Sequence, residues 1–174
     1  MTVFVLVMLP ATAMVVWAIA VERRLRALDE DAGRAMQQVG VREASRLDTV
    51  AVLLELSCDY THRQAPQMEA ARGQRCVLTT TATAVDVAAQ DALAEEALRY
   101  IGQTRECCPA FARDAAYVRA VAELDCCRQM LSASRRRYNE AAARFNAAQH
   151  RFPDRLIAGA MGLHDRKLLP ETAA

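Results

Sequence analysis

Residues 3–21 contain no charged side chain and only one polar residue, Thr12. The segment begins with Val3 and ends with Val21, and at about 1.5 Å per residue a helix over it spans roughly 28 Å. That length is close to the ~30 Å hydrocarbon core of a bilayer. Trp17 lies near the end of the segment, where an interfacial indole is expected. The segment therefore predicts a transmembrane helix.

Arginines at positions 23, 24 and 26 follow the apolar segment directly. Positive residues favour the cytoplasmic side, so the N-terminus is expected outside and the rest of the chain in the cytoplasm. The alternative is a cleaved signal peptide, because Ala18-Ile19-Ala20 resembles a small-x-small cleavage site. Against that alternative, no Lys or Arg precedes the apolar run, and the run is long for a signal peptide. A single-pass membrane anchor over residues 1–21 is the favoured interpretation.

The charge balance excludes one large class of function. The 22 Lys and Arg residues nearly cancel the 21 Asp and Glu residues, which leaves a formal charge of +1. A protein that binds nucleic acid through bulk charge has a clear basic excess, so no nucleic-acid partner is expected. With only 6 glycines and 5 prolines, the chain favours helices over loops.

The segment after the anchor has a helical pattern, with weak points at Gly33 and Gly40 where a helix could bend or end. A second helix is predicted from residue 44 to about residue 72, with Pro66 as a candidate interruption. A third helix is predicted to begin near residues 83–86 and to run through Ile101. Pro109 separates it from the next helix.

The last predicted helix has the clearest apolar pattern. Its apolar positions recur at spacings of four and three, which is typical of a coiled-coil-like seam. These positions are Tyr117, Val121, Leu124, Cys127, Leu131, Ser134, Tyr138, Ala141 and Phe145. Long helices with short connections predict an all-α fold, an antiparallel up-and-down bundle. The expected domains are an anchor (1–21), a helical stalk (22–44), the bundle (45–163) and a tail (164–174).

Two blocks of the sequence resemble the LemA family of bacterial membrane proteins. The C-terminal block matches the family pattern at Arg135, Tyr138, Asn139, Asn146, Phe152, Pro153, Leu156, Ile157, Ala158 and Gly162. A block after the anchor matches at Ala35, Gln38, Val41, Arg46, Asp48, Leu53, Glu55 and Tyr60. The chain departs from the pattern at Gly40, where the family usually has Asp, and at Ala51, where it usually has Pro.

The resemblance implies a single-pass protein of the bacterial inner (plasma) membrane with a helical bundle in the cytoplasm. It implies no enzyme, because the family has no established catalytic residues. The sequence agrees, since it contains none of the common Gly-rich phosphate-binding or nucleophile-elbow motifs. No cofactor, metal or small-molecule substrate is therefore expected.

Two adjacent cysteine pairs, Cys107-Cys108 and Cys126-Cys127, are the main candidates for chemistry. A cytoplasmic domain keeps its thiols reduced, and adjacent cysteines lack the C-x-x-C spacing of zinc sites. Neighbours on a helix point about 100° apart, so one member of each pair is expected to face the core. Ordinary packing is the favoured interpretation, and a thiol-based redox or metal site is the alternative.

A polar strip on the last helix is the second candidate. Asn139 and Asn146 are one heptad apart, and each follows an aromatic seam residue. Buried Asn can set helix register through hydrogen bonds, and an exposed strip can recognise a partner. The candidate structural or partner-contact strip is Tyr138, Asn139, Phe145, Asn146, Phe152 and Pro153.

Two further segments each have two interpretations. The run Arg135-Arg136-Arg137 covers most of the helix circumference, so it is either a solvated face or a contact for anionic lipid or an acidic partner. Residues 156–163 either close the end of the bundle or form an amphipathic contact for a membrane or partner.

The sequence as a whole predicts a non-enzymatic, membrane-anchored scaffold or adaptor. Tethering concentrates bundles at the membrane, so even weak faces could self-associate or bind membrane proteins. The alternative function is a thiol-based redox or metal sensor that uses the vicinal cysteines.

Overall fold

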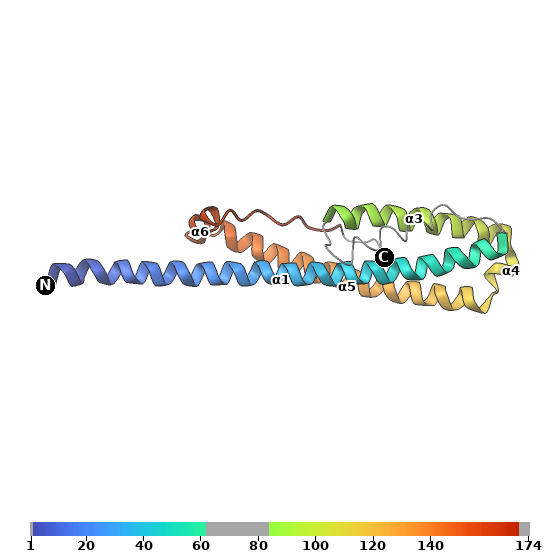
Figure 1. The fold of residues 1–174 in the computed structure, drawn as a ribbon, viewed down its shortest axis with the longest axis horizontal. Helices are drawn as coiled ribbons and strands as arrows, with labels where there is room; N and C mark the ends of the chain where they lie inside the picture. Colours follow the sequence, from blue (N-terminus) through green and yellow to red (C-terminus); the bar gives the residue numbers. More distant parts are fainter. Residues whose placement is uncertain (1, 62–83, 171–174) are drawn as a thin grey trace. The chain divides into compact units, whose positions relative to one another are not determined.

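The chain is described by a computed structural model over residues 2–61 and 84–170, without the side chains of residues 2–7, 10 and 84. Every regular element in these ranges is a helix, which confirms the all-α prediction (Figure 1). The helices are α1 (Thr2–Thr61), α3 (Ala84–Cys107), α4 (Pro109–Ala112), α5 (Ala115–His150) and α6 (Asp154–Ala160).

The first helix is longer than the sequence predicts. Neither Gly33 nor Gly40 ends it, so the predicted division into two helices is wrong. A glycine inside a helix costs about 1 kcal/mol, and the buried apolar side of α1 outweighs that cost. Leu25, Val39 and Leu54 are fully buried along it. The predicted extension to residue 72, with Pro66, lies outside the described residues.

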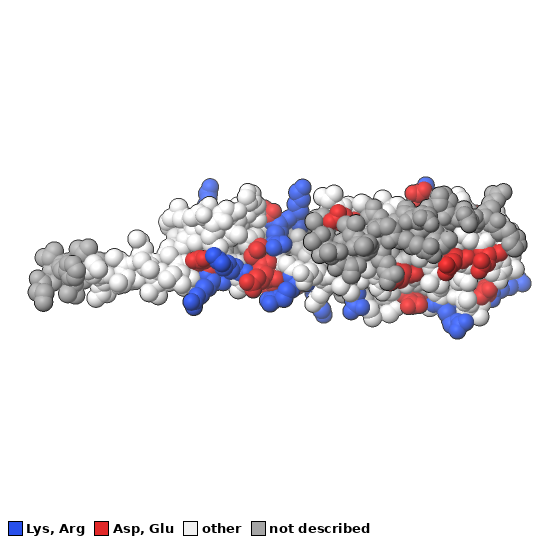
Figure 2. Space-filling model, viewed as in Figure 1, with Lys and Arg blue, Asp and Glu red and all other residues white. Residues whose placement is uncertain are grey.

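Near the N-terminus of α1, the described apolar side chains at positions 8, 9, 14–17 and 19 are exposed. Figure 2 shows this stretch without charged residues, which begin farther along the helix. Within the described residues, no helix has the length and apolarity needed to cross a membrane. The transmembrane helix expected over residues 3–21 is therefore not confirmed and stays a prediction.

Contacts divide the chain into two compact units. Unit 1 contains Met1–Arg34 and Tyr138–Leu168, and unit 2 contains Ala35–Arg137 and Leu169–Ala174. Both α1 and α5 contribute to both units. The boundaries expected from the sequence, at residues 21, 44 and 163, stay predictions.

The helix directions in unit 2 follow from its contacts. Arg46 of α1 pairs with Asp91 of α3, and Leu47 packs against Ala94, so α3 runs parallel to α1. Cys127 of α5 lies near residues 45 and 49 of α1, while residue 135 lies near residue 43, so α5 is antiparallel to α1. A helical bundle is thus confirmed. A strict up-and-down order is not confirmed for α1 and α3, whose connection (62–83) lies outside the described residues.

Four helices meet in the core of unit 2. Its buried members are Val50, Leu53 and Leu54 from α1, Ala97 and Ile101 from α3, Phe111 from α4, and Ala120 and Leu124 from α5. Pro109 begins α4, so it separates the neighbouring helices as predicted. All nine predicted seam positions of α5 are buried or half-buried, which confirms the seam.

An aromatic corner joins the ends of α1 and α5. The fully buried ring of Phe111 lies between Tyr60 and Tyr117, with ring centroids 5.3 and 4.5 Å away. Asp114 caps α5 by accepting the backbone N–H of Ala116 at 2.6 Å, and it also accepts the Tyr60 hydroxyl at 2.7 Å. The Asp114 carboxylate thus caps the N-terminus of α5 and connects it to α1 through Tyr60.

The cap predicts a pH dependence. The hydrogen bond from Tyr60, and then that from Ala116, lower the pKa of Asp114 below its ordinary 3.8. A carboxyl with a lowered pKa stabilises the fold above about pH 4 and loses that contribution as the pH falls through its folded pKa. We expect the stability advantage of the chain over Asp114→Asn to be largest near neutral pH and to shrink below about pH 4. Urea unfolding at a series of pH values measures it, and an advantage that is constant with pH would contradict the assignment.

The core of unit 1 is smaller. Val21 and Leu25 of α1 pack with Ala148 of α5 and Ala158 of α6. Figure 1 shows α6 beside this part of α1. The part of the predicted 156–163 segment that includes Ala158 therefore closes the end of a bundle, which is one of its two expected roles.

Gly162 turns the chain back after α6. Its φ of +66° lies in the left-handed region, where a side chain is strained. The backbone N–H of Leu163 then donates to Ala158 O at 3.2 Å, and that of Gly162 donates to Gly159 O at 3.2 Å. This Schellman-type ending leads into residues 163–168, which have no helical structure and which we call the strap.

Candidate functional site

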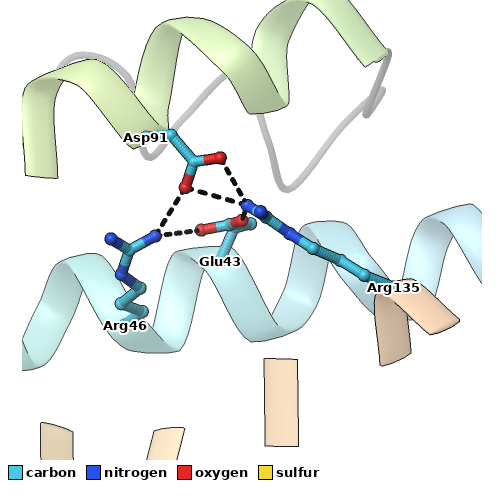
Figure 3. Close-up of polar contacts among 4 residues, drawn as sticks. All are labelled: Glu43, Arg46, Asp91 and Arg135. Atoms are coloured by element: carbon cyan, nitrogen blue, oxygen red, sulfur yellow. Dashed lines mark hydrogen bonds and ion pairs between the residues drawn. The ribbon is translucent and has the colours of Figure 1, made fainter. Parts of the chain in front are cut away.

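A cluster of four charged side chains, three of them buried and one partly buried, joins three helices of unit 2 (Figure 3). Glu43 and Arg46 come from α1, Asp91 from α3 and Arg135 from α5. Arg135 Nη2 lies 2.7 and 2.8 Å from the two carboxylate oxygens of Asp91, and it also donates to Glu43 Oε1. Arg46 Nη1 lies 2.7 Å from Asp91 Oδ1 and 3.4 Å from Glu43 Oε2. We call these four residues the ion cluster.

The ion cluster balances two positive charges against two negative ones. Glu43 is 1% exposed and Arg135 is 2% exposed, so their charges are almost fully desolvated. Burial raises the pKa of Glu43, although its hydrogen bond to Arg135 acts in the opposite direction. For Arg135, burial acts to lower the pKa, and the hydrogen bond and charge of Glu43, together with Asp91, raise it overall. Both carboxylates are held by guanidinium groups, which suits a structural link between helices.

The strap is held to α5 through its main chain. Asn146 Nδ2 donates to Arg166 O at 2.9 Å, and Arg166 N donates to Asn146 Oδ1 at 3.0 Å. Tyr138 donates its hydroxyl proton to Lys167 O at 2.8 Å. The amide of Asn146 therefore bonds both main-chain groups, the N–H and the C=O, of a single residue, Arg166.

Side chains of the strap also contact α1 and α5. Arg166 Nη2 lies 2.7 Å from Asp29 Oδ1, and its guanidinium lies 5.8 Å from the centroid of the Phe145 ring. Asp165 accepts a hydrogen bond from Gln149 and lies 2.9 Å from Nε2 of His150. The strap thus connects the N-terminal part of α1 to the end of α5.

Substituting Asn146 tests the role of the strap. Asn146→Ala removes two part-buried hydrogen bonds to the main chain of Arg166, so we expect the free energy of unfolding to fall by about 1–3 kcal/mol. Asn146→Asp keeps the acceptor for the Arg166 N–H but places a carboxylate oxygen against the Arg166 carbonyl, and it should also destabilise. Urea unfolding measures both variants. An Asn146→Ala variant as stable as the parent would contradict the assignment.

Comparison with known proteins adds the family. A model of the LemA family matches residues 35–174, which is most of the chain. The chain belongs to the LemA family. A search of curated proteins finds no match to the sequence.

The residues that carry the LemA resemblance lie in several different environments. Arg46 and Arg135 belong to the ion cluster, and Tyr138 and Asn146 hold the strap. Phe152 is 81% exposed. The contacts of Asn146 thus supply a structural role for one member of the predicted strip.

The other members of the predicted strip differ in exposure. Phe145 is buried under Arg166, Asn139 is half-buried, and Pro153 is half-buried beside the exposed Phe152. Partner recognition by this strip stays a prediction.

The three arginines at positions 135–137 also differ in exposure. Arg135 is buried in the ion cluster, whereas Arg136 and Arg137 are exposed.

Sequence reasoning missed Glu43 and Asp91, the two acids of the cluster. The spacing of Glu43 and Arg46, which puts them one turn apart on α1, was a usable signal. Asp91 lies on a different helix, α3, and no sequence pattern linked it to the other residues of the cluster.

Each vicinal cysteine pair has one exposed and one half-buried member. Cys126 and Cys127 are neighbours on α5, as predicted, whereas Cys107 ends α3 and Cys108 is the N-cap of α4. Cys107 and Cys126 are exposed, whereas Cys108 and Cys127 are half-buried. Cys127 Sγ lies 3.8 Å from Ser45 Oγ and 3.9 Å from Thr49 Oγ1. Across the described ranges, no three or more His, Cys, Asp or Glu side chains gather in a way that could hold a metal ion. A thiol-based site stays a prediction without added support.

Proposed function

We propose that this LemA-family chain is a non-enzymatic, membrane-anchored scaffold or adaptor. In this proposal residues 3–21 cross the inner membrane of a bacterium once, with the N-terminus outside. The helical bundle then lies in the cytoplasm and acts by self-association or by binding membrane proteins. The observation that carries the proposal is the exposure of the apolar N-terminal part of α1.

Seven large apolar side chains on this part of α1 are exposed to solvent in the isolated chain. They are Met8, Leu9, Met14, Val15, Val16, Trp17 and Ile19. A helix that is apolar on all sides requires an apolar environment, and a contiguous apolar surface of this kind marks a membrane or protein contact. The absence of charge from residue 3 to residue 21 favours the membrane.

The charges beyond the segment support the orientation. Arg23 and Arg24 are exposed directly after it, and Arg26 pairs with Glu22 at 2.6 Å. Cationic residues at the end of a membrane helix favour the cytoplasmic side, which supports a cytoplasmic bundle.

The interior of unit 2 supports a scaffold rather than an enzyme. Its buried acids, Glu43 and the partly buried Asp91, are engaged with arginines of neighbouring helices. A general acid or base must be able to reach a proton of the substrate, whereas these two acids contact the arginines of the ion cluster. Anchoring raises the local concentration of the bundles at the membrane, so contact surfaces of low affinity suffice for association.

The anchor is tested with two matched variants of the full-length chain. Met14→Lys with Val15→Lys places two charges within residues 3–21, and each costs about 2.5–3.5 kcal/mol near the centre of a membrane helix. The control, Val118→Lys with Met130→Lys, makes the same change at two exposed positions of α5. After alkaline carbonate washing of membranes, we expect the parent and the control in the pellet and the first variant in the supernatant. Release of the parent would overturn the anchor.

Scaffolding is tested separately by cross-linking the parent in its native membranes. We expect either a ladder at multiples of 19.2 kDa, which indicates self-association, or a discrete adduct with a membrane protein. A chain that forms neither would not be a scaffold.

A further inference from the structure

The connection between α5 and α6 and the first turn of α6 each expose one large apolar side chain. Phe152 is 81% exposed and Leu156 is 67% exposed, whereas Ala158 of the same segment is buried in unit 1. The buried core of unit 1 is formed by other residues, which are Val21, Leu25, Ala148 and Ala158. Phe152 and Leu156 form an unpartnered apolar edge.

Two arginines flank this edge. Arg151 and Arg155 are both exposed, and the backbone N–H of Arg155 donates to Arg151 O at 2.9 Å. The two arginines are therefore one turn apart. Phe152 directly follows Arg151 in the sequence, and Leu156 directly follows Arg155. We call residues 151–156 the apolar edge of unit 1.

Contacts within unit 1 place the apolar edge close to the end of residues 3–21. Val21 shares a buried cluster with Ala148 and Ala158, which flank the edge in sequence. Asp154, inside the edge, lies 3.9 Å from Nη1 of Arg24. Figure 1 agrees, because α6 lies beside α1 at this level. If residues 3–21 span the bilayer, the edge lies at its cytoplasmic surface.

We infer that the apolar edge is a second, interfacial membrane contact. Phe152 and Leu156 enter the boundary between headgroups and acyl chains, while Arg151 and Arg155 bind anionic headgroups. The cationic and apolar side chains match the two layers of that boundary, and lipid is the surface that the anchor brings to this place. The inference rests on the proposed membrane anchor and adds that unit 1 lies against the bilayer.

The test uses tryptophan fluorescence in full-length protein reconstituted into vesicles. The chain has one tryptophan, Trp17, so the parent reports on residues 3–21. A variant with Trp17→Phe and Phe152→Trp reports on the edge. A control with Trp17→Phe and Leu168→Trp reports on the strap, where position 168 is 56% exposed. Vesicles contain phosphatidylglycerol and lipids brominated at a shallow or a deep acyl position. Circular dichroism confirms the helical content of each variant.

We expect shallow brominated lipid to quench position 152 at least twofold more strongly than position 168. Quenching at 152 should fall to the level of the control when phosphatidylglycerol is omitted, or when Arg151→Gln and Arg155→Gln are added. Equal quenching at 152 and 168, with Trp17 of the parent quenched by brominated lipid, would overturn the membrane contact and leave the anchor intact. Shielding of 152 from iodide without lipid quenching would indicate a protein on the edge and would also overturn it.

If the proposed membrane anchor is wrong, the quenching experiment gives a different result. If Trp17 is not quenched but position 152 is, the anchor is wrong and the interfacial contact stands alone. If neither position is quenched by lipid, both proposals are wrong.

Discussion

Replacing Arg135 with alanine is expected to lower the free energy of unfolding by about 3–5 kcal/mol, because it leaves Glu43 buried without its main partner. Glu43 is 1% exposed, so its carboxylate depends on the neighbouring guanidinium groups rather than on bulk water. Asp91 also loses the two contacts, at 2.7 and 2.8 Å, that link α3 to α5. Equilibrium unfolding in urea, followed by circular dichroism, measures the loss.

Two control variants show whether the loss of stability is specific to the ion cluster or follows from the removal of any arginine. Arg137→Ala removes the same side chain from an exposed position two residues along α5, and it should cost within about 0.5 kcal/mol. Replacing all four members of the cluster by apolar residues of similar size should recover most of the lost stability, since burying balanced charges gives little net stabilisation. If Arg135→Ala is as mild as Arg137→Ala, the cluster does not hold the helices together.

Phe145→Ala is the second change with a large expected effect, about 3–5 kcal/mol, because it opens a cavity under the strap. Phe145 is 1% exposed, and its ring lies 5.8 Å from the guanidinium of Arg166. The change therefore removes apolar burial and a cation–π contact together. Hydrogen exchange of the Arg166 amide, which donates to Asn146, should accelerate along with the loss of global stability.

Matched variants locate the effect in unit 1. Phe145→Leu keeps most of the volume and should cost much less than Phe145→Ala. Phe152→Ala removes the same ring from a position that is 81% exposed and should leave stability in urea nearly unchanged. Equal losses from Phe145→Ala and Phe152→Ala would contradict the burial that the structure assigns to the two rings.

Local patterns predicted most of the helical architecture. The seam of α5 follows from a spacing of four and three, and every one of its positions is buried or half-buried. Pro109 marks a helix boundary because proline lacks the backbone donor. These features depend on neighbours in sequence, so the sequence alone was sufficient to find them.

Features that depend on tertiary packing were missed. Gly33 and Gly40 lower helix propensity locally, but the packing of α1 over both units keeps the helix continuous. The ion cluster combines Glu43 with Asp91, which belong to different helices, so no periodicity relates them. Residues 164–168 have no helical pattern, and their attachment to α5 is visible only in contacts such as that of Asn146 with Arg166.

The pairing of Asn146 with the main-chain N–H and C=O of Arg166 has an evolutionary consequence. The amide recognises a main-chain N–H and C=O, which every residue except proline presents in the same way. The strap can therefore change its side chains without losing this attachment, whereas position 146 cannot exchange its amide so freely. Across relatives that share this fold, we expect variation along the strap and constancy at the position that corresponds to Asn146.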